Sequence, residues 1–364
     1  TALAENAAPL PGVTVLVLNE AGIQIARLTT NDVGSAPELV LTAPDEAYSL
    51  DEANTTVRPY AVYQLRAEMT GFQTIELEGV QVFAGHQTVA RLQFLPAART
   101  LPEVEPETIP EHPLFAGDGG SGPAPIGQCA DARVLSEVVV PKKITVHLAR
   151  PAVSAANVTV SFQDYIANVA SSEVYPTWPE QALRANILAQ ISLALNRIWT
   201  EWYPSRGYSF NITGSPGYDQ AYVNGRTVFA VMERLTAELF STFVQRSGDA
   251  EPYFTEYCDG KTVTCPGMKQ WGTVDRAREG MNALQILRYY YGNRVQLVTT
   301  DNIAAIPSSY PGSPLRRGST GTNVRILQKQ LSRIAKDYPS FGKPAVTGTF
   351  DEATENSVKK FQKQ

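Results

Sequence analysis

Basic charge and long apolar runs are scarce in this sequence of 364 residues, and each scarcity excludes a class of function. No stretch of about 18 apolar residues occurs, so we expect no membrane-spanning helix. The formal net charge is −5, whereas a nucleic-acid partner normally requires a concentrated basic face, so we expect no nucleic-acid binding. The amino end lacks a basic region followed by an apolar core, and no secretion signal is visible there.

Cysteine and histidine are also scarce. Of the three cysteines, Cys258 and Cys265 lie close together and Cys129 stands alone in a Gly/Pro-rich stretch. Two close cysteines suit a small local disulfide in an oxidising compartment, and free thiols fit the same spacing. Structural zinc takes four nitrogen or sulfur ligands, and no histidine lies near the pair; the three histidines are His86, His112 and His147. We favour the disulfide over free thiols and zinc, and we expect no metal and no cofactor.

The length and the local patterns predict several domains. A chain of 364 residues is too long for one ordinary core, and 43% hydrophobic with 18% charged residues is typical of a globular protein. Residues 1–96 show short alternating apolar runs, such as Val13, Val15 and Val17, separated by turn residues, which indicates an all-β sandwich. Residues 97–131 are dense in Pro, Gly and Glu without periodicity, which predicts a linker that does not fold independently.

The second half of the chain mixes strands and helices. In residues 132–306, β-runs precede a helix whose apolar stripe starts at Leu183 and ends at Trp202, with Thr177 and Glu180 at capping-box spacing. Further helices are expected over residues 228–245 and 274–291. A linker at 307–314 leads to a small helical module at 315–364. The predicted fold class is therefore multidomain, with an all-β sandwich, an α+β domain and a small all-α module.

Short motifs in residues 1–96 resemble the transthyretin-like, carboxypeptidase-regulatory domain. They are "TTNDVG" at residues 29–34, a "Y-x-L-x-A" strand at Tyr63 and "TGF" at Thr70. Such domains usually lack catalytic groups and serve as spacers or binding modules. The resemblance implies a region that contacts other envelope or spore proteins.

Three ordered blocks in residues 142–292 resemble the stage II sporulation protein D and amidase-enhancer family. The first is "DYIANVASSEVYPTWPEQALRANILAQISLALNR" from Asp164, in which a Tyr-rich strand of the family leads to a Glu and then to a helix. The second is "DQAYVNG" at residues 219–225. The third contains "GMKQWG" at 267–272 and "ILRYYYG" at 286–292. The family consists of lytic transglycosylases that act on peptidoglycan glycan strands, so the resemblance implies an α+β transglycosylase-like domain.

The resemblance places the catalytic carboxyl at Glu173. A carboxyl in a partly apolar pocket has a raised pKa and can protonate a glycosidic oxygen. The carboxylate can then take a proton from the sugar's own C6 hydroxyl, which closes a 1,6-anhydro ring without water. Apolar and stacking walls would come from Val174, Tyr175, Trp178 and Tyr203. The residues expected to bind substrate are Tyr175, Trp178, Gln220, Tyr222, Trp271 and, as a polar contact, Gln270.

Two departures from the family pattern favour other functions. Where the family commonly has "A-A-R-T-Y" inside the helix, this chain has Gln190, Ile191, Ser192 and Leu193, so the Arg is missing. Some relatives bind zinc through two Cys and a His near Cys258, and here that His is missing. A catalytically silent structural or assembly protein of the spore or cell envelope is the main alternative, and a regulator that enhances an amidase is a third.

The tail resembles the three-helix peptidoglycan-binding module. The matching features are "L-R-x-G-S-x-G-x-x-V-x-x-L-Q-x-x-L" at residues 315–331 and "G-x-F-x-x-x-T-x-x-x-V-x-x-F-Q" at 348–362. The segment that normally follows "F-Q" is missing, so we expect a truncated module. Together the resemblances predict a protein outside the cytoplasm, at the cell wall or spore envelope, whose partner is the glycan of peptidoglycan.

Overall fold

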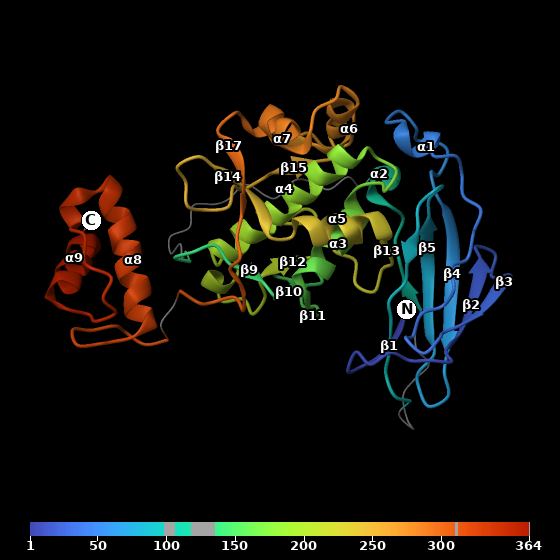
Figure 1. Cartoon of the computed structure of the whole chain (residues 1–364), viewed down its shortest axis with the longest axis horizontal. Coiled ribbons are helices and arrows are strands. Elements are labelled where there is room, and N and C mark those ends of the chain that lie inside the picture. Colours follow the sequence, from blue (N-terminus) through green and yellow to red (C-terminus); the bar gives the residue numbers. More distant parts are fainter. Residues whose placement is uncertain (98–105, 118–134, 310–311, 364) are drawn as a thin grey trace.

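The computed structural model describes residues 1–97, 106–117, 135–309 and 312–363. It is a mixed structure of helices and small sheets, in which an N-terminal region, a larger body at residues 135–309 and a C-terminal module follow one another (Figure 1). Among the described residues, no helix is both long and apolar enough to cross a membrane. Cys129 and most of the predicted 97–131 linker lie outside the described residues.

A five-stranded sheet dominates the N-terminal region, with strands in the order β3-β2-β4-β5-β8. The alternation around Val15 and Val17 produces β2, where both side chains are buried on one face, and the strand pairs antiparallel with β3 and β4. The pair of β1 and β7 contributes Ala2 and Phe94 to the same small core. The predicted two-sheet sandwich remains a prediction. The elements here are β1 (Ala2–Ala4), β2 (Thr14–Asn19), β3 (Gln24–Thr29), α1 (Ala47–Leu50), β4 (Ala61–Glu68), β5 (Ile75–Val82), β6 (Thr88–Val89) and β7 (Leu92–Phe94).

Part of the predicted linker is ordered. Strand β8 (Glu107–Thr108) pairs in parallel with β5, and helix α2 (Pro113–Ala116) follows it. Ile109, His112 and Leu114 are buried. The segment is too short to form a core, yet it folds because the sheet on one side and the body on the other bury its apolar side chains.

The body is built around α4 (Glu180–Trp199), which runs through its middle in Figure 1. Sixteen of its twenty residues are buried, because α3, α5, α6, α7 and β14 pack around it. The predicted Thr177 cap is wrong: Pro179 is the N-cap residue, and the Thr177 hydroxyl instead hydrogen-bonds to that of Ser49 at 2.8 Å.

The segment before Glu173 is a helix and not the strand that the resemblance implied. Helix α3 (Phe162–Glu173) begins after Ser161, whose hydroxyl accepts a hydrogen bond from the backbone N–H of Asp164. Ten of its twelve residues are buried, including Asn168. The Asn168 side-chain amide donates to the backbone carbonyl of Val223 and accepts from the Val223 N–H. Burial on nearly all sides removes the amphipathic period that would have identified this helix from the sequence.

Two other predicted helices are each divided. The 228–245 segment contains β13 (Val228–Phe229), α5 (Ala230–Leu239) and β14 (Thr242–Arg246), which pairs with β17. The 274–291 segment contains the end of α6 (Gln270–Arg278) and all of α7 (Ala283–Tyr291), because Gly280 adopts a positive φ of 87° and Asn282 caps a new helix. The remaining elements of the body are β9 (Val140–Pro141), β10 (Lys143–His147), β11 (Asn157–Ser161), η1 (Pro204–Arg206), β12 (Ile212–Thr213), β15 (Tyr257–Cys258), β16 (Met268–Lys269), β17 (Val295–Thr299) and β18 (Ile303–Ala304).

The N-terminal region and the body share one hydrophobic core. Tyr60 and Phe83 of the sheet belong to the same buried cluster as Tyr175 and Trp178. The short strands β6 and β13 pair across the boundary. Residues 1–96 are therefore packed firmly against the body.

The C-terminal module contains α8 (Thr322–Asp337), the 3₁₀ turn η2 (Pro339–Phe341) and α9 (Glu352–Gln362), so its described residues form two α-helices and one short turn where three helices were expected. Gln328 is fully buried between them: its amide donates to the backbone carbonyl of Thr349, and its carbonyl accepts from the N–H of Gly348. Helix α8 lies on the side of the module that faces the body (Figure 1).

Candidate active site

Glu173 is the last residue of α3, and its side chain is buried at the centre of the body with 8% exposure. Three groups donate hydrogen bonds to its carboxyl. The backbone N–H of Ala221 donates to Oε1 at 2.9 Å, while Gln190 Nε2 and the Tyr257 hydroxyl donate to Oε2 at 2.7 and 2.8 Å. The carboxyl is thus fixed in position from three separate elements.

Burial raises the pKa of Glu173 from 4.5 to about 7, against the three hydrogen bonds, which lower it because they favour the ionised form. A pKa near 7 means that the acid and the carboxylate are both populated at neutral pH. This is the range in which a carboxyl serves either as a proton donor or as a proton acceptor.

The donors to Glu173 are themselves held by a second layer of buried groups. Gln220 donates to the Tyr257 hydroxyl and accepts from the Tyr165 hydroxyl, both at 2.9 Å. The preceding residue, Asp219, accepts hydrogen bonds from Arg197 Nε at 2.6 Å and from the backbone N–H of Thr213 at 2.9 Å. Asp219 therefore anchors the 219–221 segment, which delivers Gln220 and the Ala221 N–H to the site.

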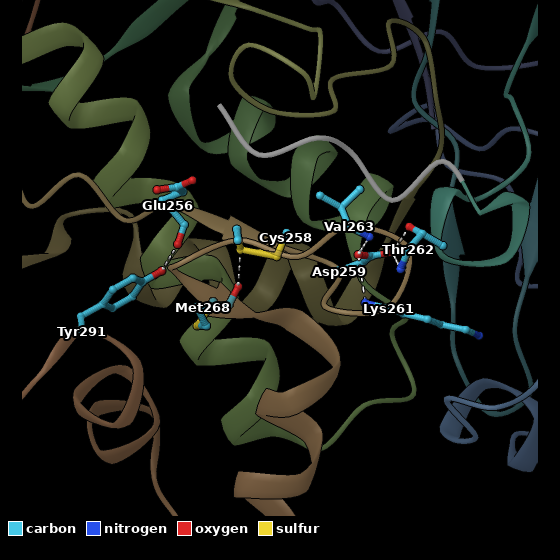
Figure 2. Close-up of a disulfide and its surroundings, with 9 residues drawn as sticks. Glu256, Cys258, Asp259, Lys261, Thr262, Val263, Met268 and Tyr291 are labelled. Atoms are coloured by element: carbon cyan, nitrogen blue, oxygen red, sulfur yellow. Dashed lines mark hydrogen bonds between the residues drawn. A yellow bond between two sulfur atoms is a disulfide. The ribbon is translucent and has the colours of Figure 1, made fainter. Parts of the chain in front are cut away.

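A disulfide joins Cys258 to Cys265 directly after Tyr257 (Figure 2). Within the enclosed loop, the buried Asp259 carboxylate accepts from the backbone N–H groups of Lys261, Thr262 and Val263. The bridge connects β15 to the segment that enters β16, so it fixes the strand that presents Tyr257. Among the described residues, no group of three or more His, Cys, Asp or Glu is arranged to hold a metal ion.

The aromatic residues expected to bind sugar lie in the protein core. Tyr175, Trp178 and Trp271 are 2–4% exposed, and their rings contact one another at 4.8–6.1 Å. Tyr175 also packs against Phe83 of the N-terminal sheet at 5.3 Å, and the Trp178 indole N–H donates to the backbone carbonyl of Ser49. Because the N-terminal region covers these rings, they present little surface to solvent.

The remaining expected side chains are also buried. Tyr203 donates to the Asp219 carboxylate, so it serves the anchor of the 219–221 segment. Gln270 is 5% exposed, and its Nε2 has no hydrogen-bond partner within the described part of the chain. Tyr222 stacks on Tyr165 at 5.6 Å and lines a cavity of about 400 Å³ between the N-terminal sheet and α3. Glu173 is not among the residues that line this cavity.

Sequence reasoning missed both side chains that donate to Glu173. Gln190 stands where the family pattern has Ala, one position before the missing Arg, and this exchange of a small residue for an amide was the signal that could have identified it. Ile191, at the position of the Arg, is fully buried in the core. No local pattern marks Tyr257, which is 84 residues away from Glu173 in the chain.

Comparison with known proteins identifies the tail. Residues 320–364 match the family described as "Putative peptidoglycan binding domain". No curated protein and no solved structure matches the chain. The match covers the C-terminal module alone, and it supports a protein that binds the cell wall, with peptidoglycan as its partner.

Proposed function

We propose that this cell-wall-binding protein cleaves the glycan strands of peptidoglycan as a lytic transglycosylase, with Glu173 as both acid and base. The observation that carries the proposal is the buried Glu173 carboxyl with a pKa of about 7, held by Gln190, Tyr257 and the Ala221 N–H. A group that must first give and then take a proton works best when its pKa lies near the working pH.

The reaction needs one carboxyl and no water. Protonated Glu173 donates its proton to the glycosidic oxygen as the bond from that oxygen to C1 breaks. The resulting carboxylate removes the proton of the C6 hydroxyl, whose oxygen bonds to C1 and closes the 1,6-anhydro ring. Oε2 accepts two hydrogen bonds and Oε1 accepts one, so Oε1 is the oxygen with an acceptor site left for the acid proton.

A second candidate is a catalytically silent structural or assembly protein of the envelope. It is favoured by the 8% exposure of Glu173 and by the packing of Tyr175 and Trp178 against the N-terminal region. In that case the Glu173 network is a buried polar core that specifies the fold, and wall binding through the C-terminal module is the whole activity.

Cleavage of purified sacculi distinguishes the two candidates. The wild type is incubated with intact and with peptide-stripped glycan strands, and 1,6-anhydro products are quantified by mass spectrometry. Glu173→Gln should lower the rate by about 10²–10⁴-fold, since Gln can neither donate an acidic proton nor accept one at neutral pH. Glu78→Gln, at an exposed position of β5, is the matched control and should retain the wild-type rate.

Each alternative has its own outcome. No cleavage by the wild type on either substrate would establish the silent protein as the better account. Cleavage that survives Glu173→Gln would mean that the catalytic carboxyl lies elsewhere.

Binding is tested separately by co-sedimentation with sacculi. Removal of residues 315–364 should reduce the bound fraction strongly, because the family match lies in this segment. Equal sedimentation of the truncated and complete chains would contradict the role of the module in wall binding.

A further inference from the structure

Charge is distributed very unevenly along the chain. Residues 315–364 contain ten Lys and Arg against four Asp and Glu, which is a net charge of +6. Residues 1–314 contain 21 Lys and Arg against 32 Asp and Glu, which is a net charge of −11. The module with the wall-binding family match is thus strongly basic on an otherwise acidic protein, a pattern that favours an anionic partner for the module.

Helix α8 uses two of these cations to contact the body. Lys329 forms an ion pair with Glu137, and Arg333 lies 3.7 Å from Glu251 and over the ring of Trp199. These contacts lie from the middle of α8 onward and hold that helix against the body. Six other cations of the module form no ion pair with any described residue: Arg316, Arg325, Lys336, Lys343, Lys360 and Lys363.

Two exposed aromatic rings stand at the ends of α8 and α9. Tyr338 is 56% exposed and Phe361 is 48% exposed. Both contact the buried ring of Phe341, at 5.6 and 5.8 Å between ring centroids, so Phe341 links the two exposed rings into one aromatic cluster. Tyr and Phe are enriched at interaction surfaces relative to the rest of a protein surface, so these two rings are candidates for contact with a ligand.

Four of the unpaired lysines lie within two residues of these rings; Lys363 follows α9, and the other three lie between the start of α8 and the end of α9. Lys336 precedes Tyr338 by two residues, Lys343 follows Phe341 by two, and Lys360 is next to Phe361. Two residues span at most about 7 Å of chain, which is within the reach of a lysine side chain. Arg316 and Arg325, by contrast, precede these rings in the chain by more than ten residues and belong to the start of the module.

We propose that this aromatic–lysine patch, made of Tyr338, Phe341 and Phe361 with Lys336, Lys343 and Lys360, is the surface by which the module binds a peptidoglycan glycan strand. The C–H face of a pyranose ring packs against an aromatic face while its hydroxyls stay in water. The lysine ammonium groups donate hydrogen bonds to the free carboxylates of the stem peptides and, where the peptide has been removed, to those of the muramyl lactyl groups. The inference rests on wall binding by the module and names the residues that perform it.

The test measures the affinity of the complete chain for sacculi freed of phosphate polymers by acid extraction. The double variant Tyr338→Ala/Phe361→Ala should lower the affinity by about tenfold, since each stacking contact is worth a few-fold, and salt should change this loss little. The triple variant Lys336→Gln/Lys343→Gln/Lys360→Gln should lower it by about tenfold in low salt and much less in 0.5 M salt, because ions screen exposed charges.

Two matched controls remove the same kinds of side chain, cationic and aromatic, from positions outside the patch. Arg316→Gln/Arg325→Gln removes unpaired cations from the start of the same module, and Tyr289→Ala removes a 58% exposed ring from α7 of the body. Both should bind like the wild type. Phe361→Tyr keeps a ring and should also retain affinity, and thermal unfolding of every variant checks that a loss of affinity does not come from unfolding.

Several results would overturn the inference. Unchanged affinity of the aromatic variant would remove the patch from the binding surface. If the Arg316/Arg325 control loses as much affinity as the lysine variant, the lysines act only through the net charge of the module. Loss of wild-type binding on extracted sacculi would identify a phosphate polymer as the ligand. If removal of residues 315–364 abolishes binding and the patch variants do not, this inference fails alone; if that removal changes nothing, wall binding by the module fails first.

Discussion

The charged groups at the centre of the body are buried, whereas those of the C-terminal module are exposed to solvent. In the body, Glu173 and the Arg197–Asp219 pair are buried, and their hydrogen bonds are made within the protein. In the module, the side chains of the Arg317–Glu352 pair are 59% and 69% exposed. Burial makes the polar groups of the body sensitive to any change in a neighbour, whereas those of the module remain in water and are free to meet a ligand.

The largest stability effect should come from the buried pair of the body. Arg197→Met leaves Asp219 as a buried charge without its counter-ion, which should cost about 3–5 kcal/mol of unfolding free energy. Urea unfolding followed by tryptophan fluorescence measures it. A loss of unfolding free energy no larger than that expected for an exposed ion pair would show that water enters this site. The two regions would then not differ in how strongly they depend on their ion pairs.

The pH dependence of stability tests the environment of Glu173. Its pKa is about 7 in the folded state and near 4.5 when unfolded, so its stabilising contribution is complete below pH 4.5 and is lost as the pH rises through 7. The loss is about 3 kcal/mol for a shift of this size. Glu173→Gln lacks this loss, so its stability relative to the wild type should improve between pH 5 and pH 8. A constant difference across that range would place Glu173 in water, and Glu78→Gln is the control that should show no trend.

The disulfide should have a smaller effect. Cys258→Ser/Cys265→Ser should lower the unfolding free energy by about 2–3 kcal/mol, because the bridge closes only a short loop of the unfolded chain. Thermal unfolding with and without reductant measures the change, and the variant should not respond to reductant. Thiol blocking of the unreduced protein should modify Cys129 alone; three modified cysteines would contradict the bridge.

The smallest effect should come from the exposed ion pairs of the module. Arg317→Gln removes contacts to Glu352 at 2.8 Å and to Glu355 at 3.8 Å, yet it should cost only about 0–1 kcal/mol because water and salt screen both partners. Thermal unfolding in low and high salt checks this. A loss as large as that of Arg197→Met would mean that the module depends on its surface charges for folding.

Patterns confined to one element were predicted well, and patterns that depend on distant contacts were not. The apolar stripe from Leu183 onward identified α4, and the alternation around Val15 identified β2. Helix α3 was missed because its buried face includes Asn168 and other polar residues, whose partners come from other parts of the chain. The predicted 228–245 helix differs because its last residues form β14, whose pairing with β17 overrides the local helical preference.

The sequence by itself determined that Glu173 is the candidate acid and that the tail is a wall-binding module, because both follow from short contiguous motifs, and for the tail the family match supports that identification. Only the tertiary structure decided the environment of that carboxyl. Gln190, the Ala221 N–H and Tyr257 meet it from 17, 48 and 84 residues away, and the body buries it far enough to raise its pKa to about 7. Desolvation and hydrogen bonding at one atom depend on every element packed around it, and no local pattern encodes that sum.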